Sequence, residues 1–484
     1  MESSRPYAAE QGTFAFLIIM FFRRKILVIQ RSLVEIADMI KHENDPSSYK
    51  DVWIKGVSID SRKIEQGNLF IPFKGENVDG HRFVEDAIKR GASAAFWQKD
   101  VPNPPMHLPI VIVEDPLLAL QELARSYRKQ LNVKVLGITG SNGKTTTKDM
   151  VASLLSLAYK VQKTEGNYNN HIGLPLTILQ LKEETEMAVL EMGMSSRGEI
   201  EFLTKLAQPN AVIITNIGES HLLDLGSREA IADAKLEIIE GLKDNGLIIY
   251  HGDEPLLQER LATYKGNGLL RTFGRRTTND LYPVEIDQTS SGNTFKMNKS
   301  NETFRLPVLG THNILNALAS MLAAEYFGIR YESMNEGFAQ LKLTNMRMEL
   351  VEGTNGVKII NDAYNASPTS MNAAIELVSN LDGFSRKILV LGDMLELGPA
   401  EEQYHYQIGQ SLDSEKIDYV FTYGKLGAYI GEGALEVLGG DRVYRFTDKN
   451  ELAKKLTEVA TSDTLVLIKA SRGMKLEEVV KFLQ

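Results

Sequence analysis

The sequence predicts an α/β protein of three domains, and two observations lead to that prediction. Short apolar runs with strand character alternate with segments of helical periodicity along most of the chain, as in parallel sheets flanked by helices. The chain has 484 residues, 43% of them hydrophobic and 24% charged, which fits a globular protein of several domains. We expect an atypical extension at 1–30, a small N-terminal α/β domain at 31–130, a central, mostly parallel domain at 131–343 and a C-terminal α/β domain at 344–484.

Composition excludes several classes of function. The formal net charge of −9 and the pI near 5.6 argue against a general nucleic-acid binder, although loops and helix ends can still bind anions locally. The chain has no cysteine, so it forms no disulfide and uses no thiolate, which fits a reducing cytosol. A bound metal would need oxygen or imidazole ligands, which favours Mg²⁺ or Mn²⁺ over structural zinc.

The N-terminal extension carries an apolar run from Thr13 to Phe22, followed by three basic residues. A bilayer-spanning helix takes about 20 residues, so the run is too short for stable membrane insertion. A signal peptide has its basic residues before the apolar run rather than after it. We therefore interpret the segment as the result of a start codon assigned too early, with the working protein beginning near Met20; a weak membrane-surface anchor is the alternative.

The first domain shows short elements. Leu33, Ile36, Ala37 and Ile40 have helical spacing, and further helices are expected at 83–89 and 117–129. A strand that runs into a polar turn is expected at 56–62, and further strands are expected at 68–73, 94–97 and 110–113.

The rest of the chain repeats a strand–helix rhythm. Central strands are expected around Gly137, Val189, Ile213 and Ile248, with helices near 144–158, 199–207, 227–241 and 312–327. Region 268–306 has short strand-like pieces and polar turns, which we interpret as an antiparallel excursion. In the last third, strands are expected at 357–361, 387–391, 419–423, 442–446 and 465–469 with helices between them, which predicts a Rossmann-like domain.

A phosphate-binding loop is the most specific motif of the sequence. The segment KVLGITGSNGKTTTK at 134–148 reads as a buried strand, a turn with Gly140 and Gly143, and a helix opened by Lys144 and Thr145. Backbone N–H groups and the helix N-terminus would hold an anion, Lys144 would reach the β- and γ-phosphates, and the Thr145 hydroxyl would ligate Mg²⁺. Ile138 stands where the common phosphate-loop pattern has glycine, so a plain glycine-rich turn is the alternative.

Polar residues follow other predicted strands of the central domain. Glu191 ends an apolar strand and could ligate Mg²⁺, or be an ordinary loop glutamate. His221 offers an imidazole after the next strand, although a lone histidine is more often structural. Lys235 lies among apolar residues at helical spacing, where an ordinary lysine would extend its amine to solvent. The donor-rich segment 164–173 could hold a polar substrate or order a loop.

The last third adds cations and one carboxylate. Arg347 could stabilise charge on a transferring phosphate, and Asp362 could accept from ribose hydroxyls. Lys469 and Arg472 follow a late strand and suit a carboxylate substrate, while a glycine-containing loop at 392–398 follows another strand. Ordinary surface cations are the alternative interpretation.

Together these residues resemble the Mur ligase family, the ATP-dependent amide-forming enzymes of cell-wall precursor synthesis. The resemblance covers 31–484, and its most specific segments are TGSNGKTTT at 139–147, NYNNHIGLP at 167–175, LEMGM at 190–194, TNIGESH at 215–221, GTHN at 310–313, RME at 347–349, NDAYNASP at 361–368, GDMLELG at 392–398 and KASRGMK at 469–475.

The resemblance implies roles for particular residues. The N-terminal domain would hold the UDP end of a nucleotide sugar near Ser61 and Arg62. ATP would bind through the loop residues Gly140, Ser141, Asn142, Gly143, Lys144, Thr145 and Thr146, with His312, Asn313, Arg347 and Asp362 also near the nucleotide. Thr145 and Glu191 would hold one Mg²⁺, and His221 with a carbamoylated Lys235 would serve a second. Lys144, His221, Lys235 and Arg347 would be the catalytic residues. Substrate contacts would involve Asn169, Asn170, His171, Tyr364, Asn365, Asp393, Lys469 and Arg472.

The implied reaction is a two-step ligation in the cytoplasm, carried out by a monomer of three domains. UDP-N-acetylmuramoyl-tripeptide would be activated by ATP as an acyl phosphate, and the amine of D-alanyl-D-alanine would then displace phosphate. The 362–368 segment fits this dipeptide-adding branch, and no Asp-Asn-Pro-Arg segment of the third-residue ligase is present. Three alternatives stay open: a sibling that adds another amino acid, the more distant folylpolyglutamate synthetase, and an ATPase switch without ligase activity.

One residue departs from the family pattern. Ala470 stands in the KASRG segment where the family usually has glycine. If that position requires a positive φ, the alanine costs about 1 kcal/mol or more.

Overall fold

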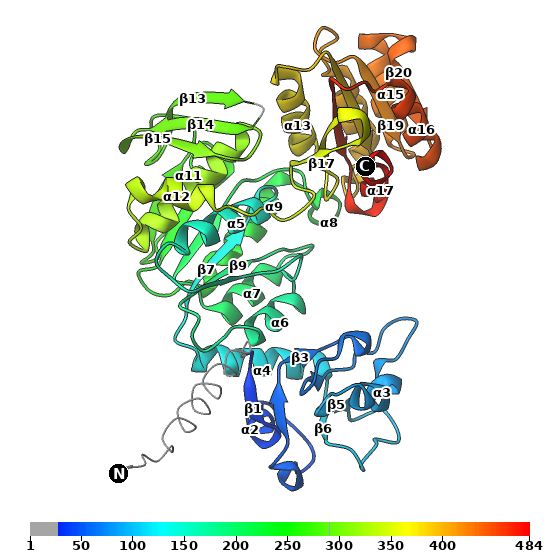
Figure 1. Ribbon diagram of the computed structural model, residues 1–484. Helices are drawn as coiled ribbons and strands as arrows, with labels where there is room; N and C mark the ends of the chain where they lie inside the picture. The colour runs from blue at the N-terminus through cyan, green and yellow to red at the C-terminus, as the bar shows by residue number, and fades with distance from the viewer. Residues whose placement is uncertain (1–27, 290) are drawn as a thin grey trace, which may run out of the picture. The chain divides into compact units, whose positions relative to one another are not determined.

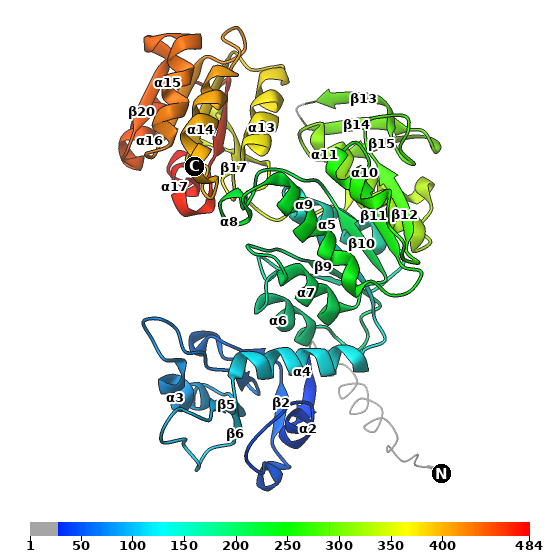
Figure 2. The same cartoon turned by 180° about the vertical axis from the view of Figure 1, so that it is seen from behind.

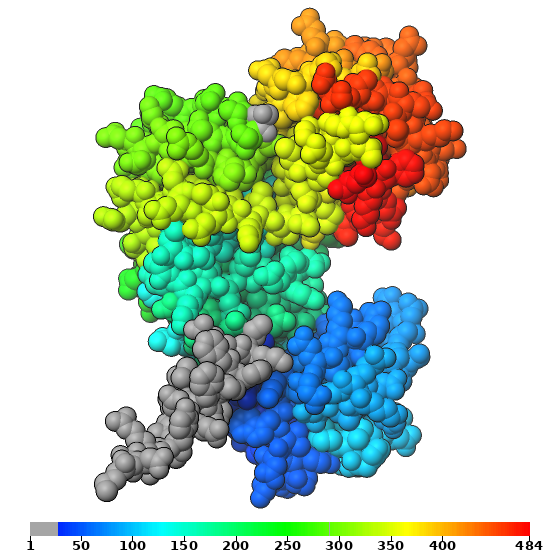
Figure 3. Space-filling view, viewed as in Figure 1, coloured from blue at the N-terminus to red at the C-terminus, as the bar shows by residue number. Residues whose placement is uncertain are grey.

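The computed structural model describes residues 28–289 and 291–484, and the chain divides into two compact units. The first unit is the chain up to Leu131 together with Ile178–Glu184, and the second is Asn132–Thr177 together with Thr185–Gln484. In Figures 1 and 3 the first unit is mainly blue and the second runs from cyan to red. The predicted extension at 1–30, interpreted as a misassigned start, falls outside the described residues over 1–27. Within the described ranges, no helix is both long and apolar enough to cross a membrane.

The first unit is built on a parallel four-stranded sheet with the order β3-β4-β5-β6. Phe70, Trp97 and Ile110 of this sheet pack with Val84 and Ala87 of a helix as one apolar core. The strands expected within 56–62 and 68–73 are only two residues long: a short 3-10 helix at Ser61–Lys63 follows the first, and Ile71, Pro72 and Phe73 after the second are not part of a strand. The elements are β1 (Gln30–Ser32) and β2 (Trp53–Lys55), which pair antiparallel, β3 (Val57–Ser58), β4 (Leu69–Phe70), β5 (Ala94–Gln98), β6 (Ile110–Val113), α2 (Leu33–Asp38), α3 (Val84–Lys89) and α4 (Pro116–Gln130).

The second unit contains a six-stranded sheet with the order β12-β11-β10-β7-β9-β8, in which every pairing is parallel. Strand β7 lies inside the sheet, so its carboxyl end opens between those of β9 and β10. The strands are β7 (Lys134–Thr139), β8 (Val161–Lys163), β9 (Met187–Glu191), β10 (Ala211–Ile214), β11 (Leu247–His251) and β12 (Leu269–Phe273). The four expected central strands are confirmed. Region 268–306 was predicted only in part, because β12 joins the parallel sheet before the antiparallel pieces begin.

Helices and a small sheet cover this central sheet. Helix α11 packs against α5 and also contacts β11 and β12. Figure 2 labels these elements from behind. Leu136, Ile138, Met150 and Leu318 belong to the core between these elements. The helices are α5 (Lys144–Leu155), α6 (Gly173–Leu179), α7 (Glu199–Ala207), α8 (Leu222–Leu225), α9 (Arg228–Leu236), α10 (Pro255–Leu261), α11 (His312–Tyr326) and α12 (Met334–Ala339), and the antiparallel sheet is β13 (Pro283–Thr289), β14 (Gly292–Met297) and β15 (Ser300–Leu306).

The last third of the second unit forms another six-stranded sheet, with the order β16-β17-β21-β18-β19-β20. All its pairs are parallel except β16–β17, an antiparallel edge that the sequence analysis did not predict. Two apolar cores lie on its faces, one with α13 to α15 and one with α16 and α17, which confirms the doubly wound arrangement. The elements are β16 (Glu349–Glu352), β17 (Lys358–Asp362), β18 (Arg386–Gly392), β19 (Tyr419–Tyr423), β20 (Val443–Phe446), β21 (Thr464–Lys469), α13 (Pro368–Asn380), α14 (Glu401–Gln410), α15 (Gly427–Leu438), α16 (Lys449–Val459) and α17 (Glu477–Leu483).

Ala470 is accommodated without strain. The residue is fully buried, and it is not among the non-glycine residues with positive φ. The condition under which alanine would be costly at this position is therefore not met. Ala470 instead restricts the neighbouring residue Gly392, because a Cβ added at position 392 would lie 2.8 Å from the Cβ of Ala470.

Candidate active site

The phosphate-binding loop joins the end of β7 to the start of α5, as predicted. Gly140 has a φ of +143°, and a Cβ there would lie 1.9 Å from Oγ1 of Thr215. Gly143 has a φ of +81° and precedes Lys144, the first residue of α5. Both positions therefore require glycine, for space as well as for backbone conformation, since a Cβ on Gly143 would lie 2.6 Å from Oδ1 of Asn316. The first-turn N–H groups of α5 have no intrahelical partner and are suited to bind an anion.

Lys144 lies folded against the loop that precedes it. Its Nζ donates to the carbonyl oxygen of Gly140 at 2.7 Å. Burial lowers the pKa of Lys144, and the nearby carboxylate of Glu191 opposes that shift. A phosphate bound in the loop would supply a stronger anionic partner for this ammonium group.

Oxygen atoms converge beside the loop. The hydroxyl of Thr145 donates to Oε2 of Glu191 at 2.9 Å, and Nδ2 of Asn169 donates to Oε1 of the same carboxylate at 2.8 Å. Glu191 is buried, and these two hydrogen bonds hold its carboxylate in position from both sides. A hydroxyl and a carboxylate are hard oxygen ligands, which fit the Mg²⁺ that the resemblance implies. Arg347 also reaches this point, since its Nη2 donates to Oγ1 of Thr145 at 3.0 Å.

A cavity of about 370 Å³ gathers most of the predicted residues of the second unit. Both six-stranded sheets of the unit contribute to it, through the loops that follow β7, β9, β10, β17 and β21. The predicted residues that line it are Ser141, Asn142, Gly143, Lys144, Thr145, Thr146, Asn169, Asn170, Glu191, His221, His312, Asn313, Arg347, Asp362, Tyr364, Asn365 and Lys469. Gly140, His171, Lys235, Asp393 and Arg472 do not line the cavity, and Ser61 and Arg62 belong to the first unit.

The nucleotide-facing residues predicted on α11 are buried or half-buried. Burial lowers the pKa of His312 to about 4, which keeps the imidazole neutral near pH 7. Asn313 donates to the carbonyl oxygen of Leu309 at 2.7 Å and accepts from Nδ2 of Asn316 at 2.8 Å. The helix thus presents an ordered polar edge to the cavity.

The C-terminal residues of the cavity form a second charged group. Asp362 is buried, pairs with the ammonium of Lys469, and accepts from the backbone N–H of Met348 at 3.2 Å. Lys469 also donates to the carbonyl oxygen of Asn365 at 3.0 Å. The guanidinium carbon of Arg347 lies 4.0 Å from the ring centre of Tyr364, a cation–π contact. Nε of Arg347 is buried and has no hydrogen-bond partner in the described part of the chain.

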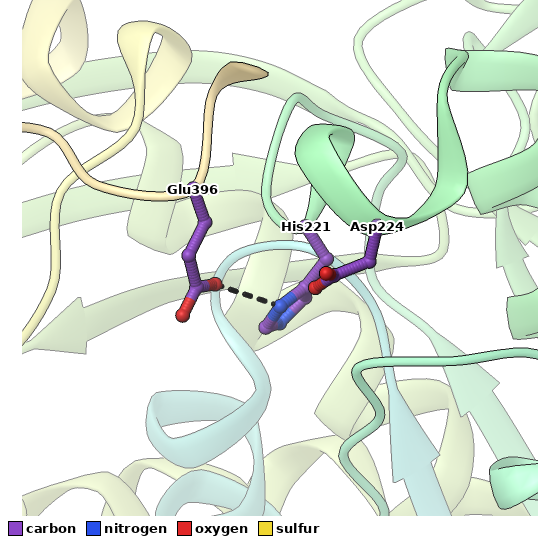
Figure 4. Close-up of side chains that lie close together, drawn as sticks. All are labelled: His221, Asp224 and Glu396. Carbon is purple, nitrogen blue, oxygen red and sulfur yellow. Dashed lines mark ion pairs between the residues drawn. The ribbon is translucent and has the colours of Figure 1, made fainter.

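His221 lies among carboxylates at the edge of the cavity. Its Nδ1 lies 2.9 Å from Oε2 of Glu396 (Figure 4). Asp224 completes the group, and one ligand atom from each residue lies within 4.8 Å of the other two. The pairing with His221 lowers the pKa of Glu396. The resemblance implies Lys235 as the companion of His221, whereas this structure groups His221 with Asp224 and Glu396.

Lys235 is an unusual buried lysine on α9. Its side chain has 2% exposure, and burial together with the charge of Lys144 lowers its pKa well below the ordinary value. A neutral amine is the form that adds CO₂ to give a carbamate. Its predicted role stays a prediction, but the environment favours the form of the side chain that such a role needs.

Other predicted residues have partners elsewhere. Asp393 accepts from the backbone N–H of Gly427 at 2.7 Å and so caps the first turn of α15. Arg472 pairs with Glu477 at 2.7 Å. In the first unit, Arg62 makes two contacts of 2.9 Å with Asp60, which lower the pKa of that carboxyl to about 2. Ser61 opens the short helix that carries Arg62.

Sequence reasoning missed several polar residues that line or brace the cavity, among them Asn216, Glu219, Asn316 and Thr369. Asn316 lies one turn beyond Asn313 on α11, and the Asn-x-x-Asn spacing was the available signal. Asn216 accepts from the backbone N–H of Asn142 at 2.9 Å. Glu219 accepts from the hydroxyl of Thr369 at 2.8 Å and so ties the loop after β10 to the start of α13. No sequence spacing indicates that contact, because the two residues are 150 positions apart.

Three family models match successive parts of the chain. They are the Mur ligase family, catalytic domain, at 53–128, the Mur ligase middle domain at 138–324, and the Mur ligase, glutamate ligase domain, at 346–472. The chain belongs to the Mur ligase family. It is accordingly an ATP-dependent ligase that forms ADP, which agrees with the phosphate-binding loop at the centre of the cavity.

Individual relatives narrow the comparison. The chain is 52% identical over 454 residues to the UDP-N-acetylmuramoyl-tripeptide–D-alanyl-D-alanine ligase of Bacillus subtilis, covering 94% of this chain and 98% of the relative. A crystal structure of MurF from Acinetobacter baumannii matches with a TM-score of 0.85 and 28% identity over 95% of this chain and 99% of that one. MurF ligase from Thermotoga maritima in complex with ADP matches with a TM-score of 0.78 and 29% identity over 88% and 96% of the two chains.

Proposed function

We propose that this chain joins D-alanyl-D-alanine to UDP-N-acetylmuramoyl-tripeptide in the cytoplasm, in the synthesis of peptidoglycan precursors, and that it works as a monomer. The observation that carries the proposal is the single cavity that contains the phosphate-binding loop, Glu191 and the C-terminal residues Arg347 and Lys469. The 52% identity to the Bacillus subtilis ligase, over nearly the whole of both chains, supports the choice of substrates.

The first step requires two anions to approach each other. The terminal carboxylate of the tripeptide attacks the γ-phosphorus of ATP, and the bond from that phosphorus to the bridging oxygen breaks. ADP is the leaving group, and the tripeptide now carries an acyl phosphate. Lys144 and the first-turn N–H groups of α5 would hold the phosphates, while the guanidinium of Arg347 would meet the charge on the transferring group. Its buried, unpartnered Nε supports this role, because a phosphate oxygen could satisfy it.

Two Mg²⁺ sites are part of the proposal. Thr145 and Glu191 would hold one ion, and His221 with a carbamate of Lys235 would serve the other. When bound, the ions would neutralise phosphate charge. The neighbouring hydroxyl and carboxylate oxygens support the first site, and the lowered pKa of Lys235 supports carbamate formation.

The second step forms the amide bond. The neutral amine of the dipeptide attacks the acyl carbon, the tetrahedral intermediate releases phosphate, and the nitrogen loses its extra proton. Lys469 and Asn365 would receive the dipeptide, with Tyr364 orienting Arg347 through its ring face. A half-buried cavity also restricts the access of water to the acyl phosphate.

Phosphate release from ATP tests the proposal directly. We expect release that requires both UDP-N-acetylmuramoyl-tripeptide and D-alanyl-D-alanine, with a UDP-muramoyl-pentapeptide detected by mass. Release that is indifferent to both substrates would refute the ligase and favour an ATPase switch. Release supported by another amino acid in place of the dipeptide would favour a sibling ligase.

Two variants make the test specific to the cavity. Lys144→Met should lower kcat by about 10²-fold or more, because it removes a charge that the transition state uses. Lys205→Met is the matched control, since Lys205 is an exposed lysine of the same unit paired with Glu201 on α7. The control should retain the activity of the parent enzyme within about twofold.

A further inference from the structure

We propose that Asp149 is a positioning residue that anchors the segment 344–348 and thereby places Arg347 at the phosphate-binding loop. This segment, called the linker below, connects the parts of the second unit that carry its two six-stranded sheets. The proposal rests on the function proposed above, and it assigns a role to a residue that does not line the cavity.

Asp149 has an unusual set of contacts for a helix residue. Its side chain is 1% exposed, and Oδ2 accepts from both the backbone N–H and the hydroxyl of Thr344, at 2.8 and 2.9 Å. Oδ1 accepts from Nζ of Lys163 at 2.6 Å, and the ammonium of Lys148 lies 3.5 Å away. Two cations therefore hold the carboxylate in place, and the linker is bonded to it across 195 residues of sequence.

The linker touches helix α5 a second time. Arg347 bonds to Thr145, which lies four residues before Asp149 and hence on the same face of the helix, about 6 Å away along its axis. Thr344 and the guanidinium of Arg347 thus contact helix α5 at two points one turn apart. A displacement of Thr344 along or away from the helix would be passed to the guanidinium of Arg347.

The linker is also hydrogen-bonded to residues of the C-terminal sheet. The backbone N–H of Met346 bonds to Oε2 of Glu349 at 3.0 Å, and that of Met348 bonds to Asp362. Met346 and Met348 have φ values of +61° and +51°, which L-residues rarely adopt. Because Arg347 lies between two residues in this conformation, its direction depends on both anchors, and Asp149 supplies the one on the nucleotide-binding helix.

A purely structural role is the alternative, in which Asp149 only joins β8 to α5 through Lys163. The two roles differ in what happens when Arg347 is absent. A positioning residue has nothing left to position, whereas a structural residue still affects the enzyme. The test is therefore a double-mutant cycle on kcat for phosphate release.

We expect Asp149→Asn and, separately, Thr344→Val to lower kcat by about 10-fold, with less than about threefold change in KM for ATP. In an Arg347→Met background, either change should lower kcat by less than about twofold. Equal losses in both backgrounds would overturn the proposal. Thr344→Ser keeps the hydroxyl donor and should restore at least half of the parent kcat.

Ser153→Ala is the matched control. Ser153 lies on the same face of α5, one turn beyond Asp149, and its hydroxyl donates to the carbonyl oxygen of Gly337 at 2.7 Å. Its loss removes a comparable contact outside the linker, so kcat should stay within about twofold of the parent. A loss equal to that of Thr344→Val would count against the proposal.

Hydrogen exchange gives a measurement that needs no turnover. The backbone amides of residues 344–348 should exchange at least 10-fold faster in Asp149→Asn than in the parent, while those of β7 stay unchanged. Unchanged exchange in the linker would refute the anchor. A parent enzyme that forms no ligated product would instead refute the proposed function, and the exchange result would still decide whether Asp149 holds the linker.

Discussion

Replacing Gly143 by alanine should destabilise the protein, and the same substitution at Gly198 shows how much of the loss comes from backbone strain alone. Gly143 and Gly198 both precede a helix, with φ of +81° and +84°. A Cβ on Gly143 would lie 2.6 Å from Oδ1 of Asn316, whereas a Cβ on Gly198 would have no atom within 4 Å. The two substitutions therefore share the backbone strain and differ in the close approach.

The magnitude follows from those contacts. Alanine in the left-handed region costs about 1–2 kcal/mol, offset by about 0.4–1 kcal/mol because alanine also restricts the unfolded chain. We therefore expect Gly198→Ala to lower the free energy of unfolding by about 1 kcal/mol. Gly143→Ala must also push aside the buried amide of Asn316, which bonds to Asn313, and should cost about 2 kcal/mol more.

Urea unfolding measures both variants on one transition, because both glycines lie in the second unit. Asn316→Ala removes the clash but not the backbone strain. In an Asn316→Ala background, Gly143→Ala should therefore lower the free energy of unfolding by about as much as Gly198→Ala does in the parent. ADP binding should weaken in Gly143→Ala alone. Equal destabilisation by Gly143→Ala and Gly198→Ala would refute the reasoning, since it would mean that the approach to Asn316 costs nothing.

Three further predictions concern ionisable groups. The folded pKa of His312, about 4, lies below its unfolded value near 6.5, so the folded state binds fewer protons and stability should fall by up to about 3 kcal/mol as the pH drops through that window. His312→Gln should flatten this dependence in urea unfolding at pH 7 and 5, and parallel curves would contradict it. Labelled bicarbonate should give a carbamate signal in ¹³C NMR that Lys235→Arg abolishes; a signal that survives the substitution would place the carbamate elsewhere. Glu396→Gln should change the free energy of unfolding by less than about 1 kcal/mol, because Glu396 is largely exposed; a larger loss would mean that the pair with His221 holds the fold.

The pattern of apolar residues predicted the fold well where it was regular. Strands such as β7 and β9 are buried on both faces and have continuous apolar sequences. In α5 and α11 the helical spacing of apolar residues extends over 12 and 15 residues. Edge strands such as β16 were missed because half of their residues are exposed and pair in only one direction. The direction of β12 depends on its partner β11, which no local pattern in 268–306 specifies.

The site was predictable where the chemistry is local and unpredictable where it depends on tertiary contact. The glycines, Lys144 and Thr145 follow from a strand, a turn and a helix that are adjacent in sequence. Asp393 was expected near the substrate from the family resemblance, and no local pattern indicated that its carboxylate accepts from the amide of Gly427, 34 residues away. The contacts of Glu219 with Thr369 likewise arise from distant segments. Composition offers no sign of such pairings.

The path of the chain through the first unit bears on how the protein is made. Residues 178–184 belong to that unit although the phosphate-binding loop is synthesised before them. The buried hydroxyl of Tyr127 donates to the carbonyl oxygen of Leu181 at 2.8 Å, and the backbone N–H of Ile29 donates to the carbonyl oxygen of Leu179 at 3.1 Å. On the ribosome, the amino-terminal unit therefore cannot complete its fold until Glu184 has emerged. A fragment cut at Leu131 would lack these acceptors, so excising this unit requires the later segment to be grafted back.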